Sequence, residues 1–155
     1  MKTPRVNIKL KNIEENAENM VKKCEKENIK LTGVVKGSAG DVKVASAFVR
    51  GGVESIGDSR IKNIKKLRKA GFEEEMVLLR LPQISEVEDV VENVDITLIS
   101  EIKTIKHLNK AALKAGKKQG IIVMVDVGDL REGVLPDDLE AFFEEIINLE
   151  AISIK

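Results

Sequence analysis

The chain has 155 residues, and its 26 Lys and Arg residues balance its 26 Asp and Glu residues, so its formal net charge at pH 7 is zero. This balance argues against a nucleic acid or an anionic membrane surface as the main partner, because both attract strongly basic proteins. One cysteine excludes an internal disulfide and fits a reducing compartment, and no segment approaches the roughly 20 apolar residues of a membrane span. We therefore expect a cytoplasmic protein.

Short β-rich segments alternate with amphipathic helices along the chain. A capping box of Asn12 and Glu15 predicts a first helix that runs to about Asn28. Asp41 is expected to begin the second helix, and the pair Gly51-Gly52 is expected to end it. The expected starts or ends of the later helices are Asp58 or Ser59, Gly71, Ser85, Ser100, Gly116 and Pro136. The predicted strands cover residues 31–35, 53–57, 76–80, 95–99, 121–127 and 150–154.

Alternation of this kind implies a parallel sheet with right-handed crossovers. A doubly wound sheet would be complete at this length, whereas an eight-unit barrel needs about 250 residues. The sequence stops inside the apolar segment 150–154, which would leave an unsupported sheet edge. We therefore expect an α/β fold with about five to six parallel strand–helix repeats, in which residues 1–155 form the N-terminal part of one TIM (β/α)8 barrel domain.

The carboxyl ends of parallel strands are where α/β proteins place their chemistry. Lys36 follows the first predicted strand, and a partly desolvated lysine there can lose its proton and attack a carbonyl to form a Schiff base. The simpler alternative is a lysine that only extends its amine to solvent at a strand end. Arg80 ends the third predicted strand and could bind an anionic ligand or pair with Glu101 or Asp126. Asp58, Ser59 and Ser100 at the same edge are expected mainly to cap helices.

Several other kinds of site are not indicated. The segment Gly37-Ser38-Ala39-Gly40 has neither the Walker pattern nor the spacing of a dinucleotide fingerprint. No Cys/His cluster suits a transition metal, and Asp126 and Asp129 have no further ligand spaced for magnesium. Cys24 is expected to be a buried small residue on a helix face, and His107 a solvated surface residue. No metal site is therefore predicted.

Several motifs, in the correct order, resemble the alanine-racemase-fold enzymes, which bind pyridoxal 5′-phosphate. The segment Val34-Val35-Lys36 is similar to the cofactor-lysine segment of that family. Residues 126–133, which read Asp-Val-Gly-Asp-Leu-Arg-Glu-Gly, are similar to the family motif Asp-x-Gly-x-x-Arg-x-Gly. Residues 53–60 and 79–82, together with the loop 128–133, look most like the ornithine racemase branch. The resemblance runs from about Thr3 to the last residue.

This resemblance implies roles for two residues. Lys36 would hold pyridoxal 5′-phosphate in a Schiff base and move the substrate α-proton on one face, and Arg131 would donate a hydrogen bond to the phenolic oxygen of the pyridine ring. In alanine racemases a tyrosine of the partner subunit acts on the opposite face, but this sequence contains no tyrosine. The phosphate-binding loops of the family belong to later barrel strands. The implied parent is a racemase that interconverts L- and D-amino acids of the alanine or ornithine class, and we expect this chain alone to have little or no racemase activity and to bind the cofactor weakly.

Two other functions stay open at this point. The single-domain pyridoxal-phosphate homeostasis proteins share the barrel and the lysine but do not appreciably racemise amino acids. A self-contained flavodoxin-like interaction domain without a cofactor is the third possibility, and it predicts a complete sheet whose last strand is covered. The barrel interpretation predicts an exposed sheet edge instead, and therefore a homo-oligomer, such as a dimer, that buries this edge.

Overall fold

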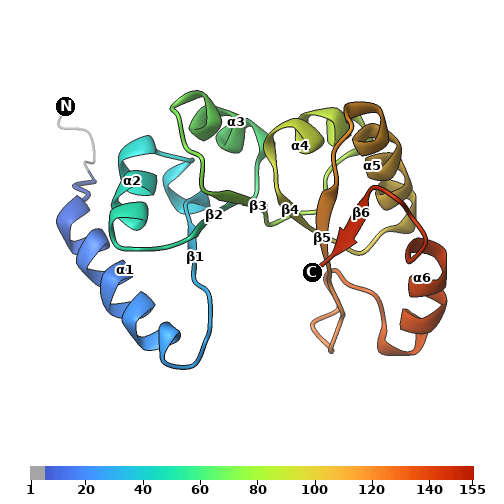
Figure 1. Cartoon of the computed structure of the whole chain (residues 1–155). Coiled ribbons are helices and arrows are strands. Elements are labelled where there is room, and N and C mark those ends of the chain that lie inside the picture. The colour runs from blue at the N-terminus through green and yellow to red at the C-terminus, as the bar shows by residue number, and fades with distance from the viewer. Residues whose placement is uncertain (1–5) are drawn as a thin grey trace, which may run out of the picture.

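The computed structural model describes residues 6–155, in which six strands form one all-parallel sheet (Figure 1). Each strand pairs with the next along the chain, in the order β1-β2-β3-β4-β5-β6. The strands are β1 (Thr32–Val34), β2 (Ser55–Asp58), β3 (Glu75–Leu78), β4 (Ile96–Ile99), β5 (Gln119–Val123) and β6 (Ile152–Ile154). A doubly wound sheet would reverse its strand order at a switch point, so this order is that of a barrel. Because β1 and β6 do not pair, the sheet is open.

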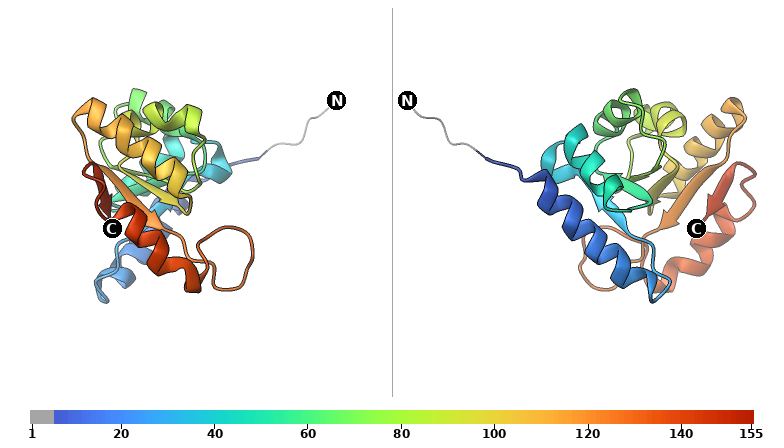
Figure 2. Two further views of the ribbon diagram at one scale, coloured as in Figure 1. Left: turned by 90° about the vertical axis from the view of Figure 1, so that its right-hand side faces the viewer. Right: turned by 60° about the vertical axis from the view of Figure 1, so that its left-hand side comes forward.

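The helices all lie on the outer side of the curved sheet (Figures 1 and 2). They are α1 (Leu10–Glu25), α2 (Val42–Arg50), α3 (Ile61–Lys69), α4 (Val87–Asn93), α5 (Ile102–Ala115) and α6 (Leu139–Ile146), with short 3-10 turns η1 (Lys36–Ser38), η2 (Ile84–Glu86) and η3 (Pro136–Asp138). Along the arc, α1 packs against α2, α3 against α4, and α5 against both α4 and α6. Within residues 6–155, no helix is both long and apolar enough to span a membrane.

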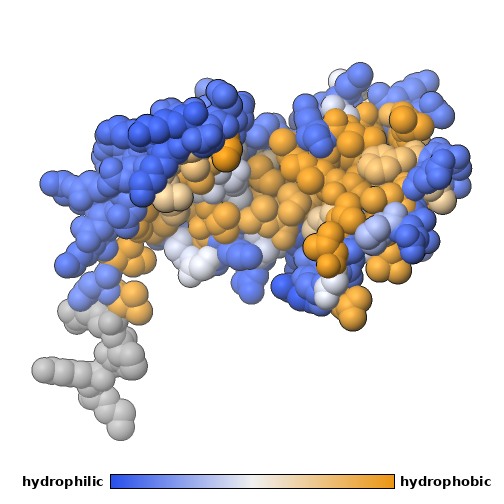
Figure 3. Space-filling model, turned by 90° about the horizontal axis from the view of Figure 1, so that it is seen from below, coloured by the Kyte–Doolittle hydropathy of each residue, from blue (hydrophilic) through white to orange (hydrophobic). Residues whose placement is uncertain are grey.

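The hydrophobic core lies between the sheet and the helices. Side chains alternate along a strand, so Ile56, Met76 and Ile121 point to the helices and are fully buried. The strand residues that point the other way line the inner, concave face, where Val34 is 41% and Ile122 37% exposed. Figure 3 shows this face from below as a broad apolar surface. The sheet is therefore covered on one side only, which is unusual for parallel strands.

Several predicted helix ends are confirmed. The Asp41 carboxylate accepts hydrogen bonds from the backbone N–H groups of Lys43 and Val44, at 2.9 and 3.1 Å, and begins α2. Gly116 ends α5 with a left-handed φ of +64°. Pro136 opens the turn η3 ahead of α6.

Three predicted caps are wrong. The helix α1 begins at Leu10, two residues before Asn12, and no side chain caps it, because its start is fixed by apolar packing instead. Ser85 lies inside η2, where Gln83 and Glu86 form the capping box. Ser100 does not cap α5, whose N-cap position is Glu101. Cys24 and His107 are both half-buried, so one is less covered and the other less exposed than expected.

Candidate functional site

Lys36 lies at the carboxyl edge of the sheet, directly after the strand β1. The last backbone hydrogen bond of this strand runs from the N–H of Val35 to the carbonyl of Gly57, at 2.9 Å. Val35 is fully buried, whereas Lys36, the next residue, is exposed and begins the turn η1. The prediction that this lysine stands at the end of a parallel strand is confirmed, but the strand is only partly buried, because Val34 lies on the open concave face and is 41% exposed.

The turn η1 is held by a dense set of hydrogen bonds to one acceptor. The carbonyl of Val35 accepts from the backbone N–H of Ser38 at 3.0 Å, from the Ser38 hydroxyl at 2.9 Å and from the N–H of Gly40 at 3.2 Å. Ala39 and Gly40 both have left-handed φ values, of +53° and +61°. This conformation is costly for alanine, and it folds the chain back so that Lys36 has a fixed backbone.

A buried polar pair on β2 and α3 supports the same turn from behind. The Asp58 carboxylate oxygen Oδ1 accepts from the backbone N–H of Arg60 at 2.8 Å and from the Asn63 amide Nδ2 at 3.0 Å. The Asn63 side chain packs directly on Gly40, where an added Cβ would lie only 2.7 Å from the Asn63 Cβ. Asp58 thus acts near the start of α3, as predicted, although the N-cap position itself is Arg60. No sequence pattern had indicated Asn63.

The loop after β5 carries Arg131 at the same edge of the sheet. The strand β5 ends at Val123, four residues earlier than predicted, and the loop is then closed by an isolated bridge between Val125 and Val134. The N–H of Asp126 donates to the carbonyl of Val134 at 2.9 Å. Both ends of the loop are therefore fixed on the sheet, and its middle, which includes Arg131, is exposed.

Asp126 organises this loop from within. Its carboxylate Oδ1 accepts from the N–H of Gly128 at 2.8 Å and from the N–H of Leu130 at 3.2 Å. These backbone hydrogen bonds favour the charged form and hold the pKa of Asp126 below its ordinary value. Leu130 adopts a left-handed φ of +54°, which is strained for this residue type. Gly133 has room for no side chain, because a Cβ there would lie 2.4 Å from the N of Asp126.

The edge carries positive charge without matching ion pairs. Among residues 6–155, Lys36, Arg80 and Arg131 have no acidic partner within 4.0 Å. Of the two alternatives for Arg80, the pairing with Glu101 or Asp126 is not formed, because the Glu101 carboxylate accepts from the Thr104 hydroxyl and Asp126 is engaged by its own loop. Of these three cations, Lys36 suits a ligand with a reactive carbonyl and Arg131 suits an anionic oxygen on the same ligand, whereas Arg80 turns to the helix side of the edge.

The concave face of the sheet lies between Lys36 and Arg131 and offers an apolar surface beside the charged edge. Lys36 and Arg131 follow the first and the fifth strand, so about 19 Å of sheet separates them, from four inter-strand steps of about 4.8 Å. Curvature of the sheet turns the concave face inward between these two positions (Figure 1). This face is apolar, so a planar ring could lie against it while its polar groups meet the charged edge.

Comparisons with known proteins point in one direction. Residues 8–155 match the family model described as alanine racemase, N-terminal domain. The chain is 40% identical to the ornithine racemase of Acetoanaerobium sticklandii over 98% of its own length and 43% of that enzyme. It is 39% identical to the lysine racemase of Thermotoga maritima over 84% of its length and 37% of that enzyme. Among solved structures it resembles the alanine racemase of Clostridium difficile 630, with a TM-score of 0.82 and 24% identity, over 93% of this chain and 39% of that one. The chain thus spans about two fifths of the relatives that it matches.

Proposed function

This chain belongs to the family of alanine racemase N-terminal domains, and we propose that it supplies the cofactor lysine, Lys36, and the ring-binding arginine, Arg131, of an amino-acid racemase. Members of this family are pyridoxal phosphate enzymes. The observation that carries the proposal is the position of Lys36, which is exposed and unpaired among the described residues at the carboxyl end of β1.

The residues present fit this cofactor. An aldehyde needs an accessible amine that no carboxylate holds, and Lys36 meets both conditions. Gly37, beside it, leaves open space, since an added Cβ would have no neighbour within 4 Å. Arg131 offers a planar donor group suited to a phenolic oxygen. The apolar concave face would shield one side of a ring from water.

When bound, pyridoxal phosphate supplies a conjugated ring that stabilises negative charge at the substrate α-carbon. Lys36 would hold the cofactor through Nζ, and once the substrate amine has replaced Nζ on the cofactor, the freed Nζ would hold or move the α-proton on one face of the substrate. Arg131 orients the ring, because the loop that carries it is fixed to the sheet at both ends. The sequence has no tyrosine, so this chain does not supply a tyrosine proton carrier for the opposite face.

The proposed substrates are basic amino acids of the ornithine or lysine class. The support is the identity of about 40% to relatives named for these substrates, against 31% to one named alanine racemase 2. The proposed assembly is a dimer. Its support is the half-covered sheet, because a second copy would bury the exposed side chains of the concave face, such as Val34 and Ile122, and one of the open strand edges.

The test combines cofactor loading with isotope exchange. Titration with pyridoxal phosphate should produce a saturable absorbance band that is lost in Lys36→Ala and kept in Lys43→Ala, which removes another exposed lysine nearby. In deuterium oxide, the loaded chain should exchange the α-hydrogen of one enantiomer of ornithine or lysine with retention of configuration, since Lys36 acts on one face only.

The contrary results are equally clear. An identical absorbance band in Lys36→Ala would show that Lys36 is not the lysine that binds the cofactor. A band without α-hydrogen exchange would favour a non-catalytic carrier of the cofactor. Racemisation by this chain alone would show that it supplies the opposite-face proton carrier as well.

A further inference from the structure

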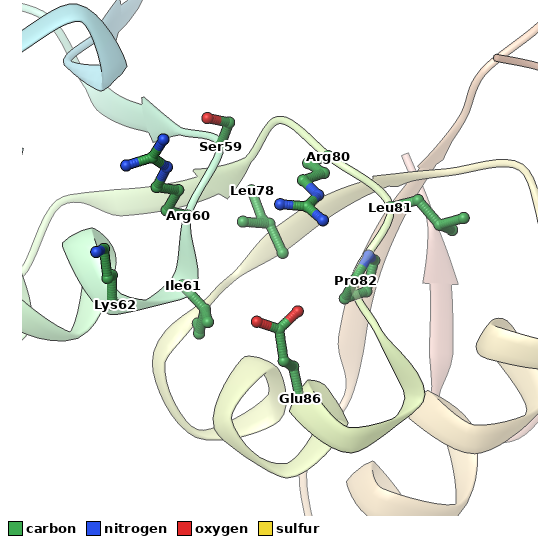
Figure 4. A pocket seen from close by; sticks show the side chains of 9 residues that line it. All are labelled: Ser59, Arg60, Ile61, Lys62, Leu78, Arg80, Leu81, Pro82 and Glu86. Atoms are coloured by element: carbon green, nitrogen blue, oxygen red, sulfur yellow. The ribbon is translucent and has the colours of Figure 1, made fainter. Parts of the chain in front are cut away.

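A small cavity lies on the helix side of the sheet, away from the turn of Lys36. It occupies about 210 Å³ between the start of α3 and the segment that follows β3 (Figure 4). Cavities for drug-sized ligands are about 300–1,000 Å³, so this one suits a single small metabolite. None of its lining residues has a role in the proposed racemase chemistry.

The cavity presents two opposite charges that do not pair. The Arg80 guanidinium and the Glu86 carboxylate extend toward each other from opposite sides (Figure 4). They are not within 4.0 Å of each other, and Arg80 has no other acidic partner among residues 6–155. Glu86 is held in place because its Oε2 accepts from the backbone N–H of Gln83 at 3.1 Å. Its other oxygen is therefore oriented and free to accept from a ligand.

Part of the remaining wall is apolar and is formed by Ile61, Leu78, Leu81 and Pro82. Leu78 and Pro82 are buried, and Ile61 is nearly so. Apolar walls strengthen the attraction between a ligand and the two charges, because less water screens it. Arg60 and Lys62 also line the cavity but extend away from Arg80 and Glu86 (Figure 4). They add positive potential around the opening without entering the space between the two charges.

We propose that this cavity binds a free α-amino acid as a zwitterion, with the ligand carboxylate on Arg80, the ammonium on Glu86 and the side chain against Leu78 and Ile61. A phosphate group would bring negative charge against Glu86, and a diamine would meet the Arg80 guanidinium. The positive surroundings of Arg60 and Lys62 favour neutral or acidic amino acids over basic ones. The assignment is independent of the proposed function, because it uses neither Lys36 nor Arg131.

An NMR titration of the ¹⁵N-labelled chain tests this site. L-Alanine and L-glutamate should cause saturable shifts of the backbone amides at Ile61 and Arg80. Arg80→Gln should weaken binding by about ten- to a hundred-fold, the usual effect of losing a charge-assisted hydrogen bond. Lys69→Gln, which removes an exposed charge at the far end of α3, should leave the affinity unchanged. Unfolding midpoints would check that the variants are folded.

Propionate, which lacks the ammonium group, separates the two contacts. It should bind more weakly than L-alanine to the native chain, and Glu86→Gln should reduce binding of alanine but not of propionate. The proposal is overturned if no titration saturates, if Arg80→Gln and Lys69→Gln behave alike, or if inorganic phosphate binds more tightly than L-alanine.

Discussion

Replacing Gly40 by alanine tests how firmly the turn that carries Lys36 is built. Gly40 has a left-handed φ of +61°, a conformation that costs an L-residue about 1–2 kcal/mol. The added Cβ would also lie 2.7 Å from the Asn63 Cβ and 3.3 Å from its Cα, so part of α3 would have to move. Forced overpacking of this kind costs about 1–3 kcal/mol. We therefore expect Gly40→Ala to lower the free energy of unfolding by about 2–5 kcal/mol.

Gly116→Ala is the matched control. Gly116 has nearly the same φ, +64°, but an added Cβ there has no neighbour within 4 Å. Only the backbone cost of about 1–2 kcal/mol should appear. Urea unfolding of both variants gives the difference directly, and Gly40→Ala alone should also slow modification of Lys36 by pyridoxal phosphate. If Gly40→Ala and Gly116→Ala lowered the unfolding free energy equally, or if Lys36 were modified at the same rate in both, Asn63 would not support this turn.

Three further predictions concern the rest of the molecule. Asp126→Ala should speed hydrogen exchange at the amides of Gly128 and Leu130, because these amides lose their acceptor. The native pKa of Asp126 is lowered, so the carboxylate stabilises the loop above the ordinary carboxyl pKa of about 3.9, and this effect is lost as the pH falls through the native pKa. The native chain and the variant should therefore exchange alike in strong acid. Arg68→Met should lower the unfolding free energy by about 2–3 kcal/mol, because Arg68 donates to the carbonyls of Asn93, Phe72 and Glu74 and pairs with Asp95; an unchanged urea midpoint would contradict this. Ile122→Lys should shift a dimer to monomers in light scattering by placing a charge on the concave face, whereas the same change at Leu113, exposed on the outer surface of α5, should not.

Local signals in the sequence predicted most of the fold. They succeed at positions where a single residue determines the local backbone conformation. Asp41 caps a helix with its own carboxylate, and Gly116 ends one because it has no side chain to oppose a left-handed φ. Both roles can be predicted without knowledge of distant residues. The predicted start of α1 at Asn12 was wrong because Leu10 and Ile13 pack on the core, and this apolar contact outweighs the cap that Asn12 could form.

The sequence predicted only those site residues whose position follows from the order of the strands. Lys36 and the loop that carries Arg131 follow parallel strands, and parallel strands end at one edge. Asn63 was missed because its contact with Gly40 joins segments more than twenty residues apart. The sequence could not decide between the two alternatives for Arg80, because nothing local shows that Arg80 turns to the helix side of the edge or that the Asp126 carboxylate accepts from backbone amides of its own loop.

The most direct test of the central claim is to identify the lysine that binds the cofactor. The chain is incubated with pyridoxal phosphate, reduced with borohydride, digested and mapped by mass spectrometry. At low cofactor excess we expect the added mass on the peptide that contains Lys36, and Gly40→Ala should reduce it. Label spread over exposed lysines such as Lys43 and Lys69, with Lys36 not enriched, would contradict the central claim.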